Sequence, residues 1–338
     1  MSPRRWIVSQ IGAREHYAVP RALHRWNRLG QLYTDVWCSI GQALLRKGPS
    51  PLPSLANRYH SALPSGKVTA YPFWAVRQRL RWWGQGDMSG EARFEHHRRV
   101  GASFGKRVRR HLEQSALAPE DSVFFGYDTG SREVLEYLAD TNALTLVDQI
   151  DPGPVHKEIV QAEMERWPGW AAEDVVRYAP YEDRRRAEWE LASAVVVNSE
   201  WSKEALIDEG VSPEKIHVVP LAYEPSTELV TPDPVPSDRP LRVLWLGTVS
   251  VNKGIQYLIE AARMLAGHPI TVTVVGPIRI QDEAVRSAPS SVEFKGRVPR
   301  DKTSEYYRWA DVFVLPTVSD GFALTQLEAM AHGLPVIA

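Results

Sequence analysis

The chain has 338 residues, 43% of them hydrophobic, and a formal net charge of -1 at pH 7. It is therefore longer than one typical domain and carries enough apolar residues for two cores. Because no recognised nucleic-acid motif accompanies its charged residues, we expect no nucleic-acid partner.

The cysteine content and the hydropathy pattern bear on the compartment. Cys38 is the only cysteine, which excludes an intramolecular disulfide and argues against a cysteine-based metal site. Residues 1–14 lack the apolar core of a signal peptide, and no apolar run approaches the roughly 18 residues that a membrane span needs. We therefore expect a cytoplasmic protein.

Apolar runs bounded by turn residues predict five strands in the first 223 residues, alternating with helical stretches. These runs are Trp6–Gln10, Val68–Tyr71, Val123–Tyr127, Leu144–Val147 and Ala194–Asn198. The alternation is typical of a doubly wound parallel sheet. Gly12, after the first run, would let the backbone approach a ligand closely, although an ordinary turn explains a glycine there equally well.

A basic segment between Arg77 and Arg110 contains ten Lys or Arg against three Asp or Glu. The tryptophans beside it are Trp74, Trp82 and Trp83. Basic and aromatic clusters can dock on an anionic bilayer, so peripheral contact with the inner membrane surface is one interpretation. The alternative, which we favour, is a solvated helix whose arginines pair with acidic stretches such as Glu158 to Glu190.

The region after the fourth predicted strand, LVDQIDPGPVHKEIV, offers polar side chains at Asp148, Asp151 and His156. A histidine titrates near neutral pH and suits proton transfer, but an exposed His156 that opens a helix is an equally simple interpretation. Ser199, which follows the fifth predicted strand, is a natural helix cap. Residues 224–240 contain five prolines and almost no apolar periodicity, which predicts a linker between two domains.

A strand, a glycine turn and a helix open the second domain. The strand is predicted over Leu241–Leu246 and the helix over Gly254–Leu265. The apolar residues on one face of this helix are Ile255, Leu258, Ile259, Ala262 and Leu265. A further buried strand, ITVTVV, ends at Gly276. This order of elements predicts another sheet covered by helices.

The C-terminal segment combines two strands, an acidic turn and a helix. The strand Val312–Leu315 leads through the turn at residues 319–321 into a helix predicted over Ala323–Ala331. Gly333 suits the left-handed residue that closes a helix, and Leu334–Ala338 begins another strand. Parallel sheets bind ligands at the carboxyl ends of their strands, and the free N–H groups of a first helical turn attract anions. We therefore expect a phosphate group at this turn.

Two carboxylates of this segment, Asp320 in the turn and Glu328 in the helix, are eight residues apart. With an anion at the helix start, both stay available to accept hydrogen bonds from hydroxyl groups, as a nucleotide sugar requires. The alternative is that Asp320 caps the helix and Glu328 lies on the solvated surface. Lys253, taken by itself, is best interpreted as an ordinary exposed lysine.

These segments, which cover nearly all of residues 241–338 in order, resemble the retaining nucleotide-sugar glycosyltransferases of family 4. That family carries two Glu with seven residues between them, and here Asp320 takes the place of the first and Glu328 that of the second. The resemblance implies that the first acid contacts the donor sugar and that the second holds the nucleotide ribose. It also directs Lys253 at the donor diphosphate, while Thr248 replaces the family's usual Arg.

The resemblance implies contacts for donor and acceptor. The further donor contacts are Gly12, Thr248, Arg297, Val298, Gly321, Phe322, Ala323 and Leu324. The residues on the acceptor side are Arg14, His16 and Asp151. The expected catalytic residues are Lys253, Asp320 and His156, the last of which lies in the region where many members place a histidine near the transferred sugar.

The fold that the resemblance implies is GT-B, with two Rossmann-like doubly wound α/β domains facing a cleft. Residues 1–223 would form the acceptor-side domain, 224–240 the linker and 241–338 an incomplete donor domain. The implied enzyme is a hexosyl- or glycosyltransferase that moves a sugar from a nucleotide-diphosphate donor to a hydroxyl acceptor with retention. The acceptor would be a glycan, a lipid-linked sugar or a small molecule, in glycan or glycolipid synthesis. No metal or other cofactor is expected, because cationic side chains would stabilise the leaving group.

Two other functions stay open. The GT-B architecture also serves nucleotide-sugar epimerases, and the changes at Asp320 and Thr248 permit a non-catalytic nucleotide-sugar-binding protein. Because the chain stops at Ala338, inside what resembles a family strand, we expect either a fragment or an incomplete second domain, with weak or absent transfer.

Overall fold

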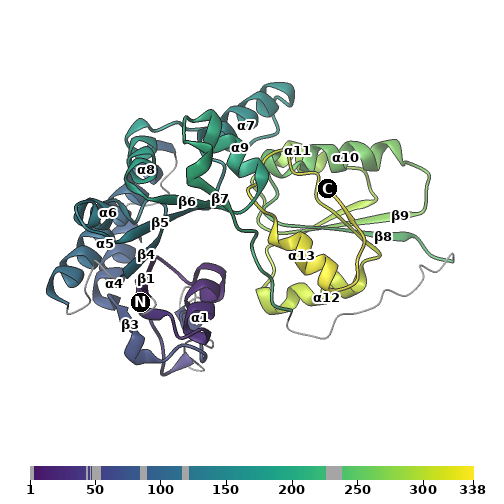
Figure 1. The fold of residues 1–338 in the computed structure, drawn as a ribbon. Helices are drawn as coiled ribbons and strands as arrows, with labels where there is room; N and C mark the ends of the chain where they lie inside the picture. The colour runs from purple at the N-terminus through teal and green to yellow at the C-terminus, as the bar shows by residue number, and fades with distance from the viewer. Residues whose placement is uncertain are drawn as a thin grey trace. The chain divides into compact units, whose positions relative to one another are not determined.

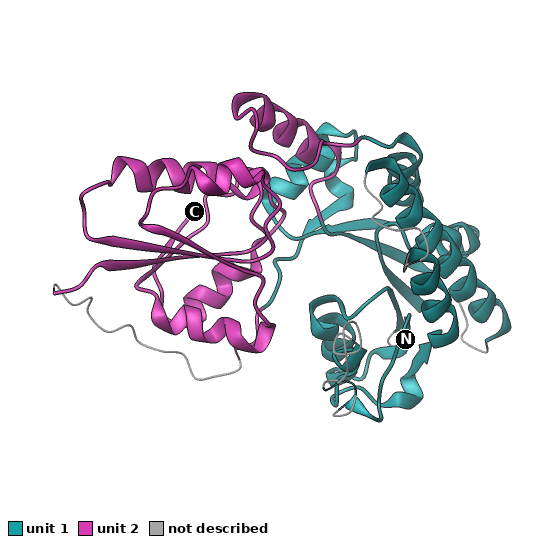
Figure 2. Cartoon of the chain, turned by 180° about the vertical axis from the view of Figure 1, so that it is seen from behind, with its two compact units in different colours: residues 1–150, 177–222 teal, residues 151–176, 223–338 magenta. Residues whose placement is uncertain are grey.

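The computed structural model describes residues 4–42, 45, 47, 55–83, 90–115, 122–225 and 238–338. The chain divides into two compact units, and each unit is built from two chain segments. Unit 1 consists of residues 1–150 and 177–222, and unit 2 consists of residues 151–176 and 223–338 (Figure 2). Each unit has its own parallel β-sheet with helices packed on it, as the sequence predicts.

The strands of unit 1 form a seven-stranded parallel sheet in the order β3-β2-β1-β4-β5-β6-β7. Their bounds are β1 Arg5–Gln10, β2 Leu29–Thr34, β3 Val68–Ala70, β4 Ser122–Tyr127, β5 Leu144–Gln149, β6 Ala194–Val197 and β7 Ile216–Val218. All five expected strands are present. The sequence analysis missed β2, whose apolar pattern Gly30 and Gln31 interrupt, and β7, which has only three residues.

Helices cover both faces of this first sheet (Figure 1). Their bounds are α1 Ala18–Arg25, α4 Pro72–Trp83, α5 Gly90–Gln114, α6 Arg132–Leu138, α8 Ala179–Leu191 and α9 Glu200–Asp208. Successive strand residues point to opposite faces, so Phe124 joins the core under α5 and α6 while Phe125 joins the core under α1. Ser199 caps α9 as predicted, because its hydroxyl accepts a hydrogen bond from the Ser202 N–H at 3.1 Å.

The strands of unit 2 form a five-stranded parallel sheet in the order β10-β9-β8-β11-β12. The strands are β8 Leu241–Leu246, β9 Ile270–Val275, β10 Val292–Gly296, β11 Val312–Val314 and β12 Val336–Ile337. The helices are α7 Pro154–Arg166, α10 Ile255–Met264, α11 Asp282–Arg286, α12 Thr303–Trp309 and α13 Leu324–Ala331. The core between them contains the fully buried side chains of Trp245, Tyr307 and Phe313.

Local sequence signals in unit 2 hold with one exception. Gly333 follows α13 with a φ of 76°, the left-handed conformation expected of it. Of the apolar residues assigned to one face of α10, the first four are buried, but Leu265 is 44% exposed. Leu265 is the C-cap residue, so it lies past the last helical turn and beyond the edge of the core. Its assignment to the buried face was wrong.

Residues 151–176 group with unit 2, although the sequence analysis places them in the first domain. Side chains of α7 and α10 hold them there: the Glu163 carboxylate accepts hydrogen bonds from the Tyr257 hydroxyl at 2.7 Å and from the Gln256 amide at 3.2 Å. The ring of Trp167 meets Tyr257 edge-on at 5.6 Å. Contacts between residues far apart in the chain decide this grouping, and no local pattern reports them.

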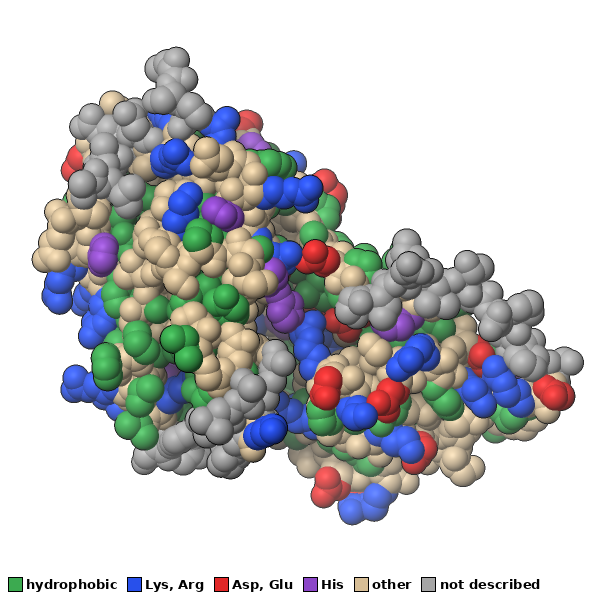
Figure 3. Space-filling model, turned by 90° about the horizontal axis from the view of Figure 1, so that it is seen from below, with side chains coloured by type: hydrophobic (Ala, Val, Ile, Leu, Met, Phe, Trp, Pro, Cys, Tyr) green, Lys and Arg blue, Asp and Glu red, His purple; other side chains and the backbone are tan. Residues whose placement is uncertain are grey.

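Two further features concern the linker and the surface. The predicted linker, residues 224–240, lies mostly outside the described residues and stays a prediction. Among the helices in the described ranges, none has the length and apolar character that crossing a bilayer requires. Side chains of both charges appear on the face shown in Figure 3, in keeping with the net charge of -1.

Candidate functional site

The loops that follow β8 and β11 lie side by side in unit 2, because these two strands are neighbours in the sheet. The Asn252 carbonyl accepts hydrogen bonds from the Thr317 hydroxyl and from the Val318 N–H, each at 3.1 Å. Between them, Gly254 has a φ of 73° and packs against the Pro316 carbonyl so closely that a Cβ atom would overlap its oxygen. The glycine therefore permits both the left-handed turn and the contact between the loops.

Lys253 and Asp320 come from these two loops and form an ion pair. Their side chains keep exposed fractions of 23% and 20%, so both can still be reached by a ligand. Asp320 does not cap α13, whose N-cap is Ala323 and has no side-chain cap. The alternative that Asp320 is only a helix cap is therefore wrong. The arrangement places one cation and one hydrogen-bond acceptor at the carboxyl edge of the second sheet.

Glu328 is not a solvated surface residue, because only 15% of its side chain is exposed. One carboxylate oxygen accepts a hydrogen bond from the Tyr307 hydroxyl at 2.9 Å, and the other lies 3.4 Å from Arg300 Nη2. Burial, reinforced by the Glu328 charge, raises the pKa of Tyr307 well above its ordinary value. The phenol therefore stays protonated and holds the carboxylate in one orientation.

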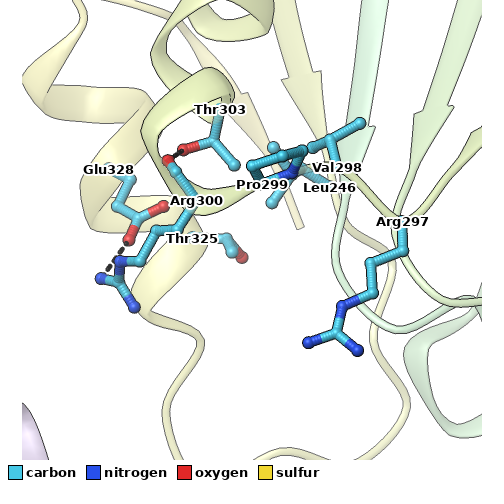
Figure 4. A pocket seen from close by; sticks show the side chains of 8 residues that line it. All are labelled: Leu246, Arg297, Val298, Pro299, Arg300, Thr303, Thr325 and Glu328. Carbon is cyan, nitrogen blue, oxygen red and sulfur yellow. Dashed lines mark hydrogen bonds and ion pairs between the residues drawn. The ribbon is translucent and has the colours of Figure 1, made fainter. Parts of the chain in front are cut away.

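A pocket of about 520 Å³ opens beside Glu328 (Figure 4). Its lining consists of Leu246, Arg297, Val298, Pro299, Arg300, Thr303, Thr325 and Glu328. Figure 4 shows the apolar residues Leu246, Val298 and Pro299 between the Arg297 side chain and the Arg300–Glu328 pair. Of the predicted donor residues, the pocket thus brings together Arg297, Val298 and Glu328. An apolar surface with a few fixed polar groups is typical of sites for small organic ligands.

His156, near the start of α7, reaches the loop that carries Asp320. Its Nδ1 lies 2.8 Å from the hydroxyl of Ser319, which is 3% exposed. Burial lowers the pKa of His156, although Asp151 opposes the shift. A neutral imidazole at pH 7 can share this hydrogen bond in either tautomer. His156 is therefore fixed beside the predicted donor site, and it is not an exposed helix-opening residue.

The remaining predicted residues of unit 2 have plainer surroundings. The Asp151 carboxylate accepts a hydrogen bond from the Gly153 N–H at 2.8 Å, in the turn before α7. Thr248 is exposed, and its carbonyl accepts the Ser250 hydroxyl at 3.1 Å. The stretch that enters α13 contains Gly321, Phe322, Ala323 and Leu324. The first N–H groups of α13 therefore follow Asp320 closely in the chain.

In unit 1, Gly12 lies in the loop after β1. The side chains that contact it, Asp35 and Arg58, were not singled out by the sequence analysis. The Gly12 N–H donates to Asp35 Oδ1 at 2.9 Å, and a Cβ atom at Gly12 would lie 2.6 Å from Arg58 Nη1. The Arg58 guanidinium therefore packs against Gly12, whereas the Arg14 guanidinium lies over the Tyr127 ring. His16 has a left-handed φ of 51°. No local signal marks Arg58, which is far from Gly12 in the chain.

Asp148 is the penultimate residue of β5, lies beside other acids of unit 1 and is 8% exposed. Burial raises its pKa to about 8, the neighbouring charges of Glu15 and Asp128 add to this, and Arg14 opposes it. The folded chain therefore keeps the proton up to about pH 8, while an unfolded chain releases it near pH ~3.9. The stability that results is fully present below pH ~4 and is lost as the pH rises toward 8.

We therefore expect the thermal midpoint of the wild type to fall between pH 5 and about pH 8, and Asp148→Asn to flatten this slope. The amide resembles the protonated carboxyl, so the variant should be the more stable protein at pH 8. Calorimetric melts across this range check the expectation, with Asp140→Asn, at an exposed turn position, as the control. Equal slopes for wild type and Asp148→Asn would contradict it.

Within the described ranges, no group of three or more His, Cys, Asp and Glu side chains is arranged to hold a metal ion. The cationic side chains at the candidate site of unit 2 are Lys253 and the pocket residues Arg297 and Arg300.

Comparison with known proteins places part of the chain beside glycosyltransferase sequences. Residues 240–338 match the family model described as "Glycosyl transferases group 1". An uncharacterized glycosyltransferase of Methanocaldococcus jannaschii is 29% identical over 148 residues, which are 42% of this chain and 37% of that protein. The amylovoran biosynthesis glycosyltransferase AmsK of Erwinia amylovora is 31% identical over 150 residues, covering 39% of this chain and 36% of AmsK. The chain thus matches less than half the length of these curated relatives.

Solved structures show the fold across nearly the whole chain. Sucrose-phosphate synthase from Thermosynechococcus elongatus has a TM-score of 0.55 at 20% identity, over 98% of this chain and 80% of that one. Anabaena HepE, in complex with UDP and glucose, has a TM-score of 0.53 at 14% identity, over 99% of this chain and 80% of HepE. The chain therefore has the GT-B fold of two Rossmann-like units that the sequence predicts.

Proposed function

We propose that this chain is a glycosyltransferase that moves a sugar from a nucleoside-diphosphate donor to a hydroxyl acceptor with retention of configuration, in glycan or glycolipid synthesis. The observation that carries the proposal is the pocket beside Glu328, which lies in the same unit as the Lys253–Asp320 pair. Both lie in the segment that matches the group 1 glycosyltransferase model. The family model and the two curated relatives reported above are glycosyltransferases by description, so neither an epimerase nor a non-catalytic binding protein is favoured.

The pocket suits the nucleoside of the donor. The base would pack on Leu246, Val298 and Pro299, which offer apolar surface between polar groups. Glu328 would accept hydrogen bonds from the ribose hydroxyls with the lone pairs that Tyr307 and Arg300 leave free. Because the Tyr307 contact fixes the carboxylate before the ligand arrives, less side-chain entropy is lost on binding.

The Lys253–Asp320 pair suits the diphosphate and the sugar. An incoming diphosphate would compete with Asp320 for the Lys253 ammonium, which leaves the carboxylate available to sugar hydroxyls. Lys253 would then stabilise the negative charge that develops on the leaving group, and the first N–H groups of α13 would add to this. Without an Arg at Thr248, Lys253 carries a larger share of this stabilisation, and no metal is required in the proposal.

His156 in unit 2 and the loop after β1 in unit 1 have proposed roles of their own. His156, held by Ser319, would orient the loop that presents Asp320 to the sugar. By the family resemblance, Gly12 would contact the donor diphosphate, and Arg14, His16 and Asp151 would contact the acceptor. The acceptor itself is proposed only as a hydroxyl compound: a glycan, a lipid-linked sugar or a small molecule.

The first test is isothermal titration of nucleoside diphosphates in the presence of a chelator. UDP is the first nucleotide to use, because the HepE structure contains UDP. We expect one diphosphate to bind and Glu328→Gln to weaken it about 10- to 100-fold, since the variant loses charge-assisted hydrogen bonds. The neighbouring helix α12 offers a matched control, Glu305→Gln, which removes an exposed carboxylate paired with Lys302 at 2.8 Å.

Three outcomes would contradict the proposal. If no nucleoside diphosphate binds, the pocket is not a donor site. If Glu328→Gln binds as tightly as the wild type, the ribose contact is wrong. If binding appears only when a divalent metal replaces the chelator, the metal-free site is wrong. Unchanged binding in Glu305→Gln shows that any loss in Glu328→Gln is specific to its position.

A further inference from the structure

Helix α4 has two apolar faces, and one of them packs inside unit 1. Trp74 and Ala75 are buried on that face. The Trp74 Nε1–H donates to the Ser103 hydroxyl of α5 at 2.9 Å, and its ring lies 5.6 Å from that of Phe104. Trp82, two turns further along, meets His96 of α5 edge-on at 4.5 Å. This face therefore fixes how α4 lies against α5.

The opposite face of α4 is apolar and bare. Phe73, Val76 and Leu80 are 91%, 52% and 57% exposed, respectively. They are three and four residues apart, so they lie in one stripe on the side of the helix away from Trp74 and Ala75. Large side chains exposed singly are common, but a stripe of three along one helix marks an interaction surface.

Cations border this stripe. Arg77 and Arg81 are exposed, follow Val76 and Leu80 directly in the chain, and are one helical turn apart. In the described part of the chain neither arginine forms an ion pair. The favoured interpretation of the basic segment, pairing with Glu158 to Glu190, does not hold for these two.

Arginines of the neighbouring helix differ, because they pair within it. Arg98 and Arg99 bind Glu95 at 2.7 and 2.5 Å, and Arg109 binds Glu113 at 2.8 Å. These three also depart from the predicted pairing with Glu158 to Glu190. The charge of α5 is thus partly neutralised locally, whereas no described carboxylate pairs with the two arginines beside the apolar stripe of α4.

We propose that the α4 face, formed by Phe73, Val76, Arg77, Leu80 and Arg81, docks unit 1 on the surface of an anionic lipid bilayer. The apolar stripe enters the boundary between headgroups and acyl chains, while the guanidinium groups bind lipid phosphates. An interfacial helix needs both features on one side, and α4 presents both.

A second copy of this chain is the other occupant to consider. A symmetric dimer through the α4 face would bring Arg77 and Arg81 close to their own counterparts. Like charges facing each other oppose such an association, whereas anionic headgroups complement them. Charge complementarity therefore favours the bilayer, and self-association becomes an outcome of the test.

The test is co-sedimentation of the full chain with vesicles of phosphatidylcholine alone and of phosphatidylcholine with an equal amount of phosphatidylglycerol. We expect binding to the anionic vesicles only, and weaker binding at about 0.5 M salt. Phe73→Ser combined with Leu80→Ser should weaken it about tenfold or more, because apolar area no longer leaves water. Arg77→Gln combined with Arg81→Gln should weaken it about 10- to 30-fold.

Matched controls come from exposed positions elsewhere. Met264→Ser removes a side chain that is 83% exposed on α10, and Arg25→Gln removes an exposed cation at the end of α1; both should bind vesicles like the wild type. If the wild type does not bind anionic vesicles, or if the α4 variants bind them as the controls do, the proposal is wrong. If sedimentation velocity shows a dimer that Phe73→Ser dissociates, the face joins copies of the chain instead.

The vesicle assay does not depend on the proposed transfer activity. Nucleotide titration of the same variants separates the two, because the α4 face lies in unit 1 and the nucleotide pocket in unit 2. Vesicle binding without nucleotide binding would support the docking surface and contradict the donor site. Nucleotide binding without vesicle binding would contradict only the docking surface.

Discussion

Lys253→Met is expected to lower kcat/KM for sugar transfer about 100- to 1000-fold, because Lys253 is the cation placed to stabilise the leaving diphosphate. Methionine keeps the length of the side chain and removes its charge. The affinity for the nucleoside diphosphate should fall as well, while the affinity for the nucleoside alone should stay unchanged. Steady-state kinetics with the donor identified by titration, together with titrations of both ligands, measure these effects.

Lys295→Met is the matched control, since Lys295 forms an exposed pair with Glu293 at 2.5 Å on β10. It should leave both kinetics and binding at wild-type values.

Asp320→Asn should lower transfer with a smaller effect on nucleoside-diphosphate affinity, because its proposed contact is with the sugar. Wild-type turnover in Lys253→Met, or equal loss of nucleoside and diphosphate affinity, would show that the lysine does not act on the diphosphate.

Gly254→Ala is expected to destabilise the protein by about 3 kcal/mol or more, through two effects that act together. The left-handed φ of 73° disfavours any residue with a Cβ, and the new atom would overlap the Pro316 carbonyl oxygen. The loops that carry Lys253 and Asp320 would have to separate, so nucleoside-diphosphate binding should be lost with the stability. Chemical denaturation and the nucleotide titration measure the two losses.

Gly267→Ala separates the two effects. Gly267 also has a left-handed φ, of 91°, but nothing lies within 4 Å of the position that a Cβ would take. We expect this control to lose only about 1–2 kcal/mol, from the backbone conformation, and to keep nucleotide binding. Equal losses in the two variants would show that the contact between Gly254 and the Pro316 carbonyl is not tight.

The sequence by itself determined the elements whose signals are local. The apolar runs that became β4, β5, β8 and β9 alternate with helices, and this alternation is typical of a parallel α/β architecture. Ser199 and Gly333 marked helix ends because capping chemistry involves only neighbouring residues. The spacing of Asp320 and Glu328 lies within one short segment as well, and the family resemblance that makes them candidate donor residues rests on it.

Only the tertiary structure decided which distant residues meet. The hydrogen bond from Tyr307 to Glu328, the contact of His156 with Ser319, and the position of Arg58 against Gly12 all join residues from separate elements. The grouping of residues 151–176 with unit 2 and the bare face of α4 are of the same kind. Such contacts depend on how whole elements pack, whereas a sequence pattern reports only the faces and ends of single elements.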